Sequence, residues 1–412
     1  MNVLHLATTY PLHAGDSNAV FVEALAESVA GRGHQVDVLL PAHPALQIEQ
    51  RGGGVRLHAF RYSPCRRWHP WGYAQALTAD RALRWDAYAA ALPATISAAR
   101  AIRRILSTAS VDLVHAHWLL PNGPIVAAAL RGCRQPFIIS CHGSGVFLCQ
   151  RHRWAAALAR RALRSCSAVT ACSRELADRV ERLGAGPEVE WIPYGVDTAL
   201  FTPLKPEQCE AMRDSIARRH GLSPQGRWIL AVGRLVPKKG FDQLVAALPW
   251  VLSHVPSVQL LIAGAGPMAA SLRQQAAVTG VEDRVHLLGP LAHQKLPDYY
   301  AAADVVAVPS VHGPGGNVDG LPNTFLEALA SGAAVVASRV GGIPDVARDG
   351  ETVVLVPEED IGSLAAALSE VLTDEKRCRA LSEAARADAE RHLGWEEVAR
   401  RFEQLYFKVL GR

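Results

Sequence analysis

The sequence predicts an α/β protein made of two doubly wound domains, each with a parallel sheet between layers of helices. Short, continuously apolar runs alternate with segments of helical periodicity along most of the chain. Strands that are apolar at every position are typical of parallel sheets, because crossover helices cover both faces. The runs form two sets of six, separated near residue 195, and a chain of 412 residues is long enough for two or three domains.

The first domain is expected to span residues 1–195. Its six predicted strands are Val3–Ala7, Gln35–Leu40, Val55–Phe60, Leu113–His115, Phe137–Ser140 and Ala168–Ala171. Residues 61–92 are rich in Trp and Arg and fit a βα unit poorly. We interpret them as an elaboration of this domain.

The second domain is expected to span residues 196–390. The joint lies near Trp191–Gln208, where prolines interrupt regular structure. A helical pattern at Gln208–His220 leads into six more predicted strands, which are Trp228–Val232, Val258–Ala263, Val285–Leu288, Val305–Val308, Ala334–Ala337 and Thr352–Val356. Residues 391–412 contain a last helix, Trp395–Leu410.

The composition indicates a cytoplasmic protein. No uncharged apolar run reaches the length of about 18 residues that a membrane-spanning helix needs. The first residues predict a strand and lack the basic start of a signal peptide. The eight cysteines contain no CxxC pair and are expected to be buried free thiols rather than disulfides.

Charge is distributed unevenly along the chain. Residues 1–195 hold 21 Arg, no Lys and 13 acids, whereas residues 196–412 hold 22 basic and 26 acidic residues. A genome that favours arginine explains this as well as a basic face directed at an anionic partner does. Both interpretations stay open.

Ligands of doubly wound sheets bind beyond the carboxyl ends of the strands, and four loops of the second domain lie there. In the first, AVGRLVPKKG, Arg234 follows a strand and Lys239 precedes a helix. Two cations beside a helix N-terminus suit a phosphate, although ordinary surface charge would look the same.

The second loop, AGAGPMAASL, matches a dinucleotide fingerprint at Gly264, Gly266 and Ala269. It follows the second strand of its domain and lacks the acid that would bind a ribose, so we interpret it as a tight turn lining the same cleft. In the third loop, the backbone around Gly289 could hold a flat base, as many turns could.

The fourth loop, PSVHGPGGNVDGLPN, leads into a short helix. Asp319 opens a turn at Gly320 and Leu321, and Asn323 and Thr324 begin the helix, whose free amides can meet phosphate or sugar oxygens. Farther along, Asn323, Glu327 and Ser331 form one polar stripe. A carboxylate in apolar surroundings needs a partner, and sugar hydroxyls would serve; the alternative is a stripe that faces solvent.

The first domain has polar groups at its own strand ends. Gly15 follows the first strand, His115 and His117 end another, and His142 begins the CHGSGVF loop. Two histidines at this spacing can bind a metal, but the sequence offers no compelling third ligand. The chain also contains no Asp-x-Asp, so we expect no metal-dependent nucleotide-sugar site.

Taken in order, these motifs resemble the retaining glycosyltransferases of family four, which are hexosyltransferases with the GT-B fold. The similar stretches are TTYPLHAG, GRGHQVDVLLP, DLVHAHW, HGSGV, PYGVD, GRLVPKKGFDQL, IAGAGP, VHLLGPL and DGLPNTFLEALASG. The resemblance implies two Rossmann-like domains facing across a cleft and a final helix that crosses back to the first domain.

The resemblance also implies roles for individual residues. Arg234 and Lys239 would hold the diphosphate of a UDP- or GDP-linked sugar, and no other cofactor is implied. Glu327 would bind the nucleotide ribose and Asp319 would lie near the donor sugar, as the two acids of the family's Glu-x7-Glu pattern do. His142 would lie near the sugar and the acceptor.

Departures from the family pattern weaken some of these roles. Asp319 is one methylene shorter than the usual Glu, Gly145 replaces the usual acid of HGxD, and Gly15 stands where the family often has two glycines. Loss of a nucleoside diphosphate from the anomeric carbon would be assisted by the cations that neutralise it. The acceptor would be a glycan, a lipid-linked glycan or a small molecule, in polysaccharide or glycolipid biosynthesis.

Other classes stay open. A nucleotide-sugar epimerase of the same fold could carry similar sites. An NAD(P)-dependent oxidoreductase would use Gly264–Ala269 but leaves Arg234, Lys239 and Glu327 unexplained. A carbohydrate-binding protein on an inactive enzyme fold is opposed by the same intact residues.

The segment Arg151–Cys166 carries a cluster of positive charge. Its basic residues are Arg151, His152, Arg153, Arg160, Arg161 and Arg164, beside an apolar stripe of Trp154, Leu158 and Ala162. A basic amphipathic helix can lie on an anionic membrane, at the inner face in this case. Alternatively, the stripe packs on the domain's own sheet and the arginines are solvated.

Overall fold

The computed structural model describes residues 1–13, 15–16, 18–48, 54–63, 70–73, 77–78, 82–83, 85–313 and 315–412. The chain divides into two compact units. The first contains Met1–Gly195 and Trp395–Arg412, and the second contains Val196–Gly394. The sequence places these boundaries at residues 195 and 390.

The first unit is built on a parallel sheet of seven strands in the order β3-β2-β1-β6-β7-β8-β9. The strands are β1 (Asn2–Leu6), β2 (Gln35–Pro41), β3 (Val55–Phe60), β6 (Leu113–His117), β7 (Phe137–Cys141), β8 (Ala168–Ala171) and β9 (Val189–Trp191). The sequence predicts six of them and misses β9. This strand has three residues including Glu190 and lies at the edge, so it needs no continuous apolar run.

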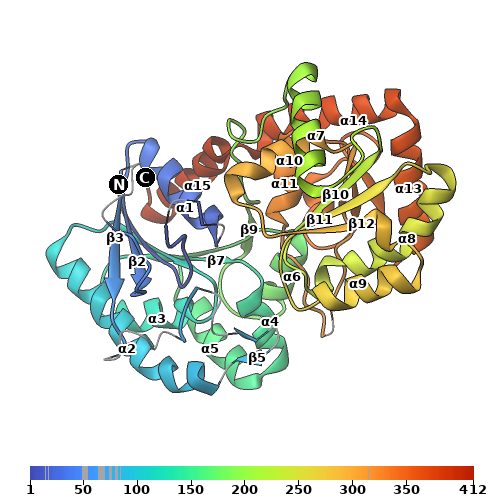
Figure 1. The fold of residues 1–412 in the computed structure, drawn as a ribbon. Coiled ribbons are helices and arrows are strands. Elements are labelled where there is room, and N and C mark those ends of the chain that lie inside the picture. The colour runs from blue at the N-terminus through green and yellow to red at the C-terminus, as the bar shows by residue number, and fades with distance from the viewer. Residues whose placement is uncertain are drawn as a thin grey trace. The chain divides into compact units, whose positions relative to one another are not determined.

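Helices cover both faces of this sheet (Figure 1). They are α1 (Val20–Gly31), α2 (Trp85–Thr108), α3 (Asn122–Ala129), α4 (Ser144–Arg151), α5 (Arg153–Leu163), α6 (Arg174–Glu181) and α15 (Trp395–Leu410). The core on one face contains side chains of α2 to α6, and the core on the other contains side chains of α1 and α15. Alternate residues of β1 serve the two cores, with Leu4 on one side and Val3 on the other.

The last helix, α15, packs against α1. Val398, Phe402 and Tyr406 recur at helical spacing and are buried in the core that α1 shares. Residues 395–412 therefore belong to the first unit although 199 residues separate them from Gly195 in the sequence.

Residues 61–92 only partly form an elaboration. The first half of the motif RRWHPWGY, residues 66–69, lies outside the described residues. A short antiparallel pair, β4 (Leu77–Thr78) and β5 (Ala82–Leu83), stands apart from the main sheet. Helix α2, however, begins at Trp85, so residues 85–92 belong to the crossover between β3 and β6.

The second unit is built on a parallel sheet of six strands in the order β12-β11-β10-β13-β14-β15. The strands are β10 (Trp228–Val232), β11 (Gln259–Ala263), β12 (Val285–Gly289), β13 (Val305–Val308), β14 (Val335–Ser338) and β15 (Val354–Val356). All six were predicted, with shifts of one or two residues at their ends. Each is a short run of mainly apolar residues, which is the strongest local signal for a buried strand.

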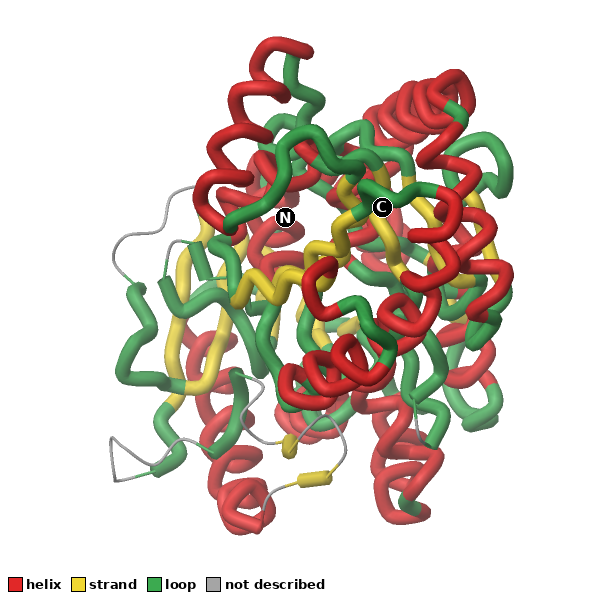
Figure 2. Tube along the Cα trace, turned by 45° about the vertical axis from the view of Figure 1, so that its right-hand side comes forward, coloured by secondary structure: helices red, strands yellow, loops and turns green. Residues whose placement is uncertain are grey.

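The α-helices of the second unit are α7 (Pro206–His220), α8 (Phe241–His254), α9 (Ala269–Val278), α10 (Leu296–Ala302), α11 (Asn323–Ala330), α12 (Ile343–Val346), α13 (Ile361–Thr373) and α14 (Glu375–Asp388). Short turns of other helix types are η1 (Pro237–Lys239), η2 (Glu282–Arg284), η3 (His293–Lys295) and η4 (Ala389–Leu393). The strands of this α/β architecture run among the helices in Figure 2. Helices α8, α9 and α13 share one core with the sheet, while α10 and α11 contact its strands separately.

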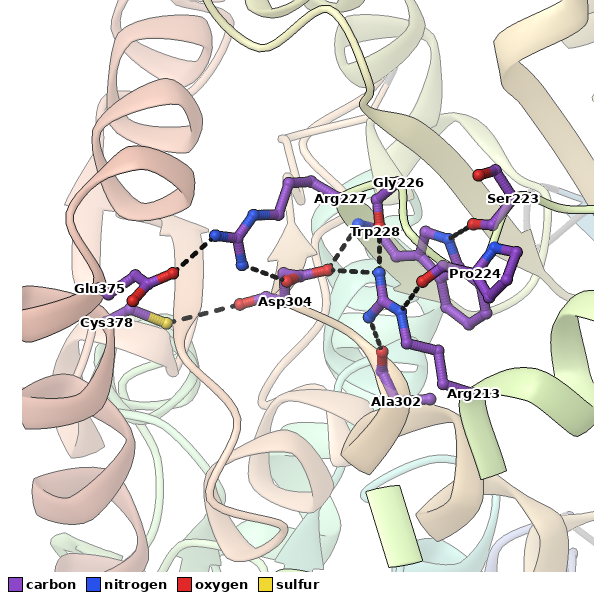
Figure 3. Close-up of polar contacts among 10 residues, drawn as sticks. All are labelled: Arg213, Ser223, Pro224, Gly226, Arg227, Trp228, Ala302, Asp304, Glu375 and Cys378. Carbon is purple, nitrogen blue, oxygen red and sulfur yellow. Dashed lines mark hydrogen bonds and ion pairs between the residues drawn. The ribbon is translucent and has the colours of Figure 1, made fainter. Parts of the chain in front are cut away.

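A charged network joins α7 to the amino end of the second sheet (Figure 3). Asp304 precedes β13 and accepts hydrogen bonds from Arg213 at 3.0 Å, Arg227 at 2.8 Å and the backbone amide of Trp228 at 2.7 Å. Arg213 also lies over the Trp228 ring. The charges of Asp304, Arg213 and Arg227 are therefore paired within the protein.

The expectation that the cysteines are buried is confirmed for only some of those that the structure describes. The seven described cysteines are all free thiols, and three of them are buried; Cys65 lies outside the described residues. Every helix in the described part of the chain is too short or too polar to traverse a bilayer.

Candidate functional site

The strand order of the second unit locates its ligand crevice. Connections run in opposite directions from the neighbouring strands β10 and β13, and ligands of doubly wound sheets bind at such a switch point, beyond the carboxyl ends. The loops that leave these two strands contain Arg234 and Lys239 on one side and Asp319 on the other. Residues 80 positions apart are thereby brought to one place.

Asp319 binds two lysines at this point. Its carboxylate oxygens lie 2.9 Å from Lys238 Nζ and 2.6 Å from Lys239 Nζ. The three side chains are only 13–14% exposed. Lys239 was predicted as a site residue, whereas Lys238, which η1 brings to the same carboxylate, was not.

The two lysines keep Asp319 ionised. Burial by itself raises the pKa of Asp319, but the ammonium groups of Lys239 and Lys238 together outweigh it and hold this pKa well below its usual value of 3.8. The carboxylate therefore stays ionised at neutral pH. The cluster has two positive charges and one negative charge, which leaves it attractive to an anion.

Glycines bring the neighbouring loops into backbone contact. A Cβ on Gly264 would lie 1.8 Å from the carbonyl oxygen of Gly233, and one on Gly266 would lie 2.5 Å from that of Leu235. Both glycines have positive φ, and Leu235 donates a backbone hydrogen bond to Ala265. These glycines therefore serve tight packing against the 233–235 loop, which supports the interpretation of a tight turn over a dinucleotide fingerprint.

Glu327 is buried, so the alternative of a solvent-facing stripe is wrong. The residue is 5% exposed. Its carboxylate oxygens lie 3.1 Å from His293 Nε2 and 3.0 Å from the Tyr300 hydroxyl, which donates to it. The protein itself thus supplies the partners that a buried carboxylate needs, and neither His293 nor Tyr300 was predicted.

This contact changes the chemistry of its partners. The hydrogen bond to Glu327 raises the pKa of His293, against the effect of burial. Burial, together with the Glu327 charge, raises the pKa of Tyr300 well above 10. Two donors hold the Glu327 carboxylate in place, and its contact with a ribose stays a prediction.

The start of α11 offers groups for an anion. Pro322 precedes the helix, and no side chain among the described residues caps its N-terminus. Asn323 and Thr324 are partly exposed and Leu321 is buried. Gly320 stands beside Asp319, whose carbonyl oxygen would lie 2.2 Å from a Cβ on Gly341.

The third predicted loop begins at Gly289, the last residue of β12. The Gly289 carbonyl accepts a hydrogen bond from the Gly264 amide.

In the first unit the switch point lies between β1 and β6. Gly15 follows β1 with a φ of 85°, and His117 is the last residue of β6. His142, after β7, lies within hydrogen-bond distance of both His117 and Tyr194, at 3.1 and 2.9 Å. His117 and His142 therefore meet at the carboxyl edge of this sheet, and Gly15 lies in the loop that leaves β1.

The structure supplies a third histidine beside His115 and His117, but their arrangement does not suit a metal. Nitrogens of His5, His115 and His117 lie within 4.8 Å of one another. The rings of His115 and His117 are stacked at 4.2 Å, so their lone pairs do not converge. Both nitrogens of His115 already bind Tyr406 and Ser140. We therefore describe the group as a hydrogen-bonded cluster.

Gly145 has a packing reason. A Cβ at this position would lie 2.8 Å from both the amide nitrogen and the carbonyl oxygen of Leu120. An acid in the manner of HGxD would displace that backbone. The absence of the acid thus follows from the close approach of α4 to the segment after β6.

A cleft of the second unit lies away from these residues. It has a volume of about 330 Å³ and is lined by Arg227, Asp304, Ser331 and Cys378, among others. These residues belong to the amino edge of the sheet, opposite the Lys238–Lys239–Asp319 cluster. The residues that line it include none of the predicted site residues, so this cleft is separate from the predicted site.

The chain is similar to known proteins along most of its length. Residues 212–388 match the family described as glycosyl transferases group 1, and residues 88–200 match glycosyltransferase family 4. A GDP-mannose-dependent α-(1-6)-phosphatidylinositol monomannoside mannosyltransferase of Mycolicibacterium smegmatis is 32% identical over 76% of this chain and 81% of its own length. A D-inositol 3-phosphate glycosyltransferase of Xylanimonas cellulosilytica is 37% identical over 60% of this chain and 58% of its own.

Solved structures agree on the fold. A sucrose-phosphate synthase from Thermosynechococcus elongatus superposes over the whole of both chains, with a TM-score of 0.78 and 22% identity. At this identity the similarity shows the architecture alone. The expectation of two Rossmann-like α/β domains of the GT-B type is confirmed.

Proposed function

Because this chain belongs to glycosyltransferase family four, we propose that it transfers a hexose from a nucleoside diphosphate sugar to a lipid-linked acceptor, with retention of configuration. The observation that carries the donor class is the Lys238–Lys239–Asp319 cluster at the switch point of the second sheet. A pair of cations at such a position suits a diphosphate.

The chemistry follows from where charge develops. As the bond between the anomeric carbon and the diphosphate oxygen breaks, its electron pair goes to the diphosphate. Lys238, Lys239 and Arg234 would stabilise that negative charge, and the free amides at the start of α11 would add to it. The acceptor oxygen then bonds to the anomeric carbon on the face that the diphosphate leaves, and its proton goes to the departing phosphate.

The Asp319 carboxylate is paired with Lys238 and Lys239. This carboxylate neutralises part of the charge that the diphosphate would meet. Donor binding would therefore require Asp319 to share the lysines, which frees an oxygen for a sugar hydroxyl. Its role near the sugar is part of this proposal.

The donor identity can be tested directly. The mannosyltransferase relative is named for GDP-mannose, so GDP-mannose is the first candidate, with UDP- and ADP-sugars beside it. A ligand at 100 times its dissociation constant stabilises the folded state by about 2.7 kcal/mol, which thermal unfolding detects.

The donor that stabilises is then incubated with acceptors. Release of nucleoside diphosphate together with a glycosylated product supports transfer. An epimerised nucleotide sugar with no acceptor consumed would favour the epimerase, and a change in NAD(P)H absorbance would favour the oxidoreductase. If no nucleotide sugar stabilises the protein or reacts, the proposed activity is wrong.

An exposed apolar and basic face favours a lipid-linked acceptor. Trp154 and Leu158 on α5 are 48% and 44% exposed, whereas Ala162 is fully buried. The predicted three-residue stripe is thus split. The alternative in which it packs on the domain's own sheet is wrong for Trp154 and Leu158, since α5 packs through its alanines and Leu163.

Helix α2 extends this face. Trp85, Leu92 and Ile96 are exposed at helical spacing, and with Trp154 and Leu158 they make five of the nine large apolar side chains exposed among the described residues. Helix α3 contacts both α2 and α5, so the two helices lie in one layer of the first unit (Figure 1).

The surface charge of α2 to α5 is mainly positive. The stretch from Ala87 to Arg174 contains eleven arginines and one acid, Asp112. All eleven arginines are exposed. Aromatic and aliphatic side chains among cations suit an anionic lipid surface, where each cation contributes about 1 kcal/mol. We name this face, made by Trp85, Leu92, Ile96, Trp154 and Leu158 with the arginines of α2 and α5, the Trp–Arg face.

Vesicle sedimentation tests the lipid surface. Binding is expected to rise with the fraction of anionic lipid and to fall with salt. Changing Trp154 and Leu158 together to Ser, or Arg153, Arg161 and Arg164 together to Gln, should each move the protein to the supernatant.

Matched variants of the second unit serve as controls. Trp250, 58% exposed, is changed to Ser, and the exposed Arg218, Arg219 and Arg273 are changed to Gln. These should sediment as the wild type does. A wild-type protein that stays in the supernatant with anionic vesicles at low salt would make a soluble acceptor the better choice.

A further inference from the structure

Three buried histidines of the first unit form a chain of hydrogen bonds. His5 Nδ1 lies 3.1 Å from His117 Nε2, and His117 Nδ1 lies 3.1 Å from His142 Nε2. His142 Nδ1 then lies 2.9 Å from the hydroxyl of Tyr194. The hydrogen bonds thus run from β1 through β6 to His142, which the resemblance to family four predicts to lie near the donor sugar.

This chain of hydrogen bonds ends at His5. His5 is fully buried, and among the described residues its Nε2 has no hydrogen-bond partner. A neutral imidazole has one N–H and one bare nitrogen, so the chain can point in only two directions. In one direction His5 Nε2 would carry a buried proton with no acceptor. In the other it is a bare acceptor.

The second direction costs less. An unpaired buried N–H is rarer in proteins than an under-satisfied acceptor. His5 Nδ1–H then donates to His117 Nε2, and His117 Nδ1–H donates to His142 Nε2. His142 is left with its own proton on Nδ1, where Tyr194 accepts it.

We propose that His117, itself oriented by His5, is a positioning residue that keeps the His142 ring neutral with its proton on Nδ1. His142 then acts as a hydrogen-bond donor toward an oxygen at the Tyr194 side, and it cannot act as a base at Nε2. This inference rests on the proposed function only for its effect on transfer, because the proton position can be observed in the free protein.

The surroundings reinforce this state. The His142 ring lies against those of Phe21 at 4.8 Å and Trp118 at 5.0 Å, which limits its rotation. Burial lowers the pKa of His142 to about 3, so the ring is neutral over the usual range of assays. A second proton on Nε2 would face the His117 N–H and would require the whole chain to reverse.

Nitrogen-15 NMR of histidine-labelled protein locates the proton. The wild type should show a neutral His142 with the proton on Nδ1. In His117→Phe this preference should be lost, whereas His117→Asn, whose amide can donate from the position of Nδ1, should retain it. Tyr194→Phe removes the acceptor but leaves His117 in place, so the Nδ1 proton should persist.

The control is Tyr406→Phe, which removes a buried hydrogen bond to His115 at 2.8 Å without touching the chain. Its His142 signals should match the wild type. Thermal unfolding checks that each variant is folded, and where His117→Phe is not, His5→Phe breaks the chain one residue farther back. A His142 proton that stays on Nδ1 in folded His117→Phe or His5→Phe overturns the inference.

Kinetics test the consequence for transfer. His117→Phe should lower kcat at least about tenfold, the lower end of the effect of removing a group that orients a functional imidazole. The KM for the donor should stay within twofold, and His117→Asn should recover most of kcat. Unchanged kcat in His117→Phe, with His142→Phe impaired, overturns the positioning role. Unchanged kcat in His142→Phe instead refutes the proposed role of His142 in transfer. The NMR spectra would still test the proton position on His142 independently.

Discussion

The substitution Asp319→Asn removes one negative charge from between two ammonium groups and keeps the size of the side chain. Lys238 and Lys239 lie 2.9 and 2.6 Å from the carboxylate and are 13% exposed. Removing one partner of a buried ion pair costs about 3–5 kcal/mol, because it leaves an uncompensated charge. We take the lower value of about 3 kcal/mol, since these lysines keep some contact with water.

This loss is large enough to measure. For a unit of about 200 residues such as Val196–Gly394, 1 kcal/mol corresponds to roughly 2–4 °C in Tm, so the variant should melt about 6–12 °C below the wild type. A nucleoside diphosphate should reverse much of this loss. Its phosphates neutralise the lysines, and no carboxylate competes for them, so the variant should also bind the diphosphate more tightly than the wild type does.

The pH dependence has a definite sign. The pKa of Asp319 is lowered in the folded protein, so its contribution to stability is present above the unfolded value near 3.8 and is lost as the pH falls through the lower folded value. The difference in Tm between wild type and variant should be constant from about pH 5 to 7 and should shrink below about pH 3.9.

A matched control lies at the other edge of the same sheet. Asp304 is 15% exposed and also accepts from two cations, Arg213 and Arg227 (Figure 3). Asp304→Asn should lose comparable stability, but a diphosphate should rescue it no more than it stabilises the wild type. If Asp319→Asn melts with the wild type, or if the diphosphate rescues both variants equally, the assignment of this cluster as a diphosphate site is refuted.

Three further outcomes are expected. Arg234→Ala and Lys239→Ala should each lower turnover by about 10²-fold, and Lys239→Arg should restore it only in part because the fork geometry differs; near wild-type turnover in both alanine variants would remove this role. Transfer should persist in excess EDTA, and its abolition with recovery on adding Mg²⁺ or Mn²⁺ would show that the cations are not the whole account. Glu327→Gln should weaken the binding of a nucleoside diphosphate by about 1.5–3 kcal/mol if the carboxylate binds the ribose. The variant should also lose a pH effect on stability. Because the pKa of His293 is raised in the folded protein, its pairing with Glu327 stabilises the wild type fully below about pH 6.5, and this stabilisation is lost as the pH rises through the folded value. Urea unfolding of wild type and variant at pH 6 and 9 would show the difference.

Local signals in the chain determined most of the fold. Twelve of the thirteen strands of the two large sheets were predicted, because each is an apolar run that a buried parallel strand requires. The missed strand, Val189–Trp191, lies at an edge, where one side of the strand needs no partner and Glu190 is tolerated. Helix α15 was placed correctly as a helix, since its amphipathic period is local.

The sequence by itself also identified three residues of the loops at the switch point of the second unit, although it missed Lys238. Arg234, Lys239 and Asp319 follow strand ends, and the rule that ligands bind beyond the carboxyl ends needs only the strands and their direction. Each of these signals lies within a few residues of the element that positions it. That is why local spacing was sufficient to find Arg234, Lys239 and Asp319.

Only the tertiary structure decided which groups hold those residues. Glu327 meets His293 and Tyr300, 34 and 27 positions away, and His142 meets His117 and Tyr194, 25 and 52 positions away. Such partners leave no periodic trace, because a hydrogen bond between distant elements depends on how sheets and helices pack and not on local spacing. The same reason applies to Trp154 and Leu158: a helical pattern shows that they share a face, but only packing decides that the face of α5 turned to the core is made of its alanines.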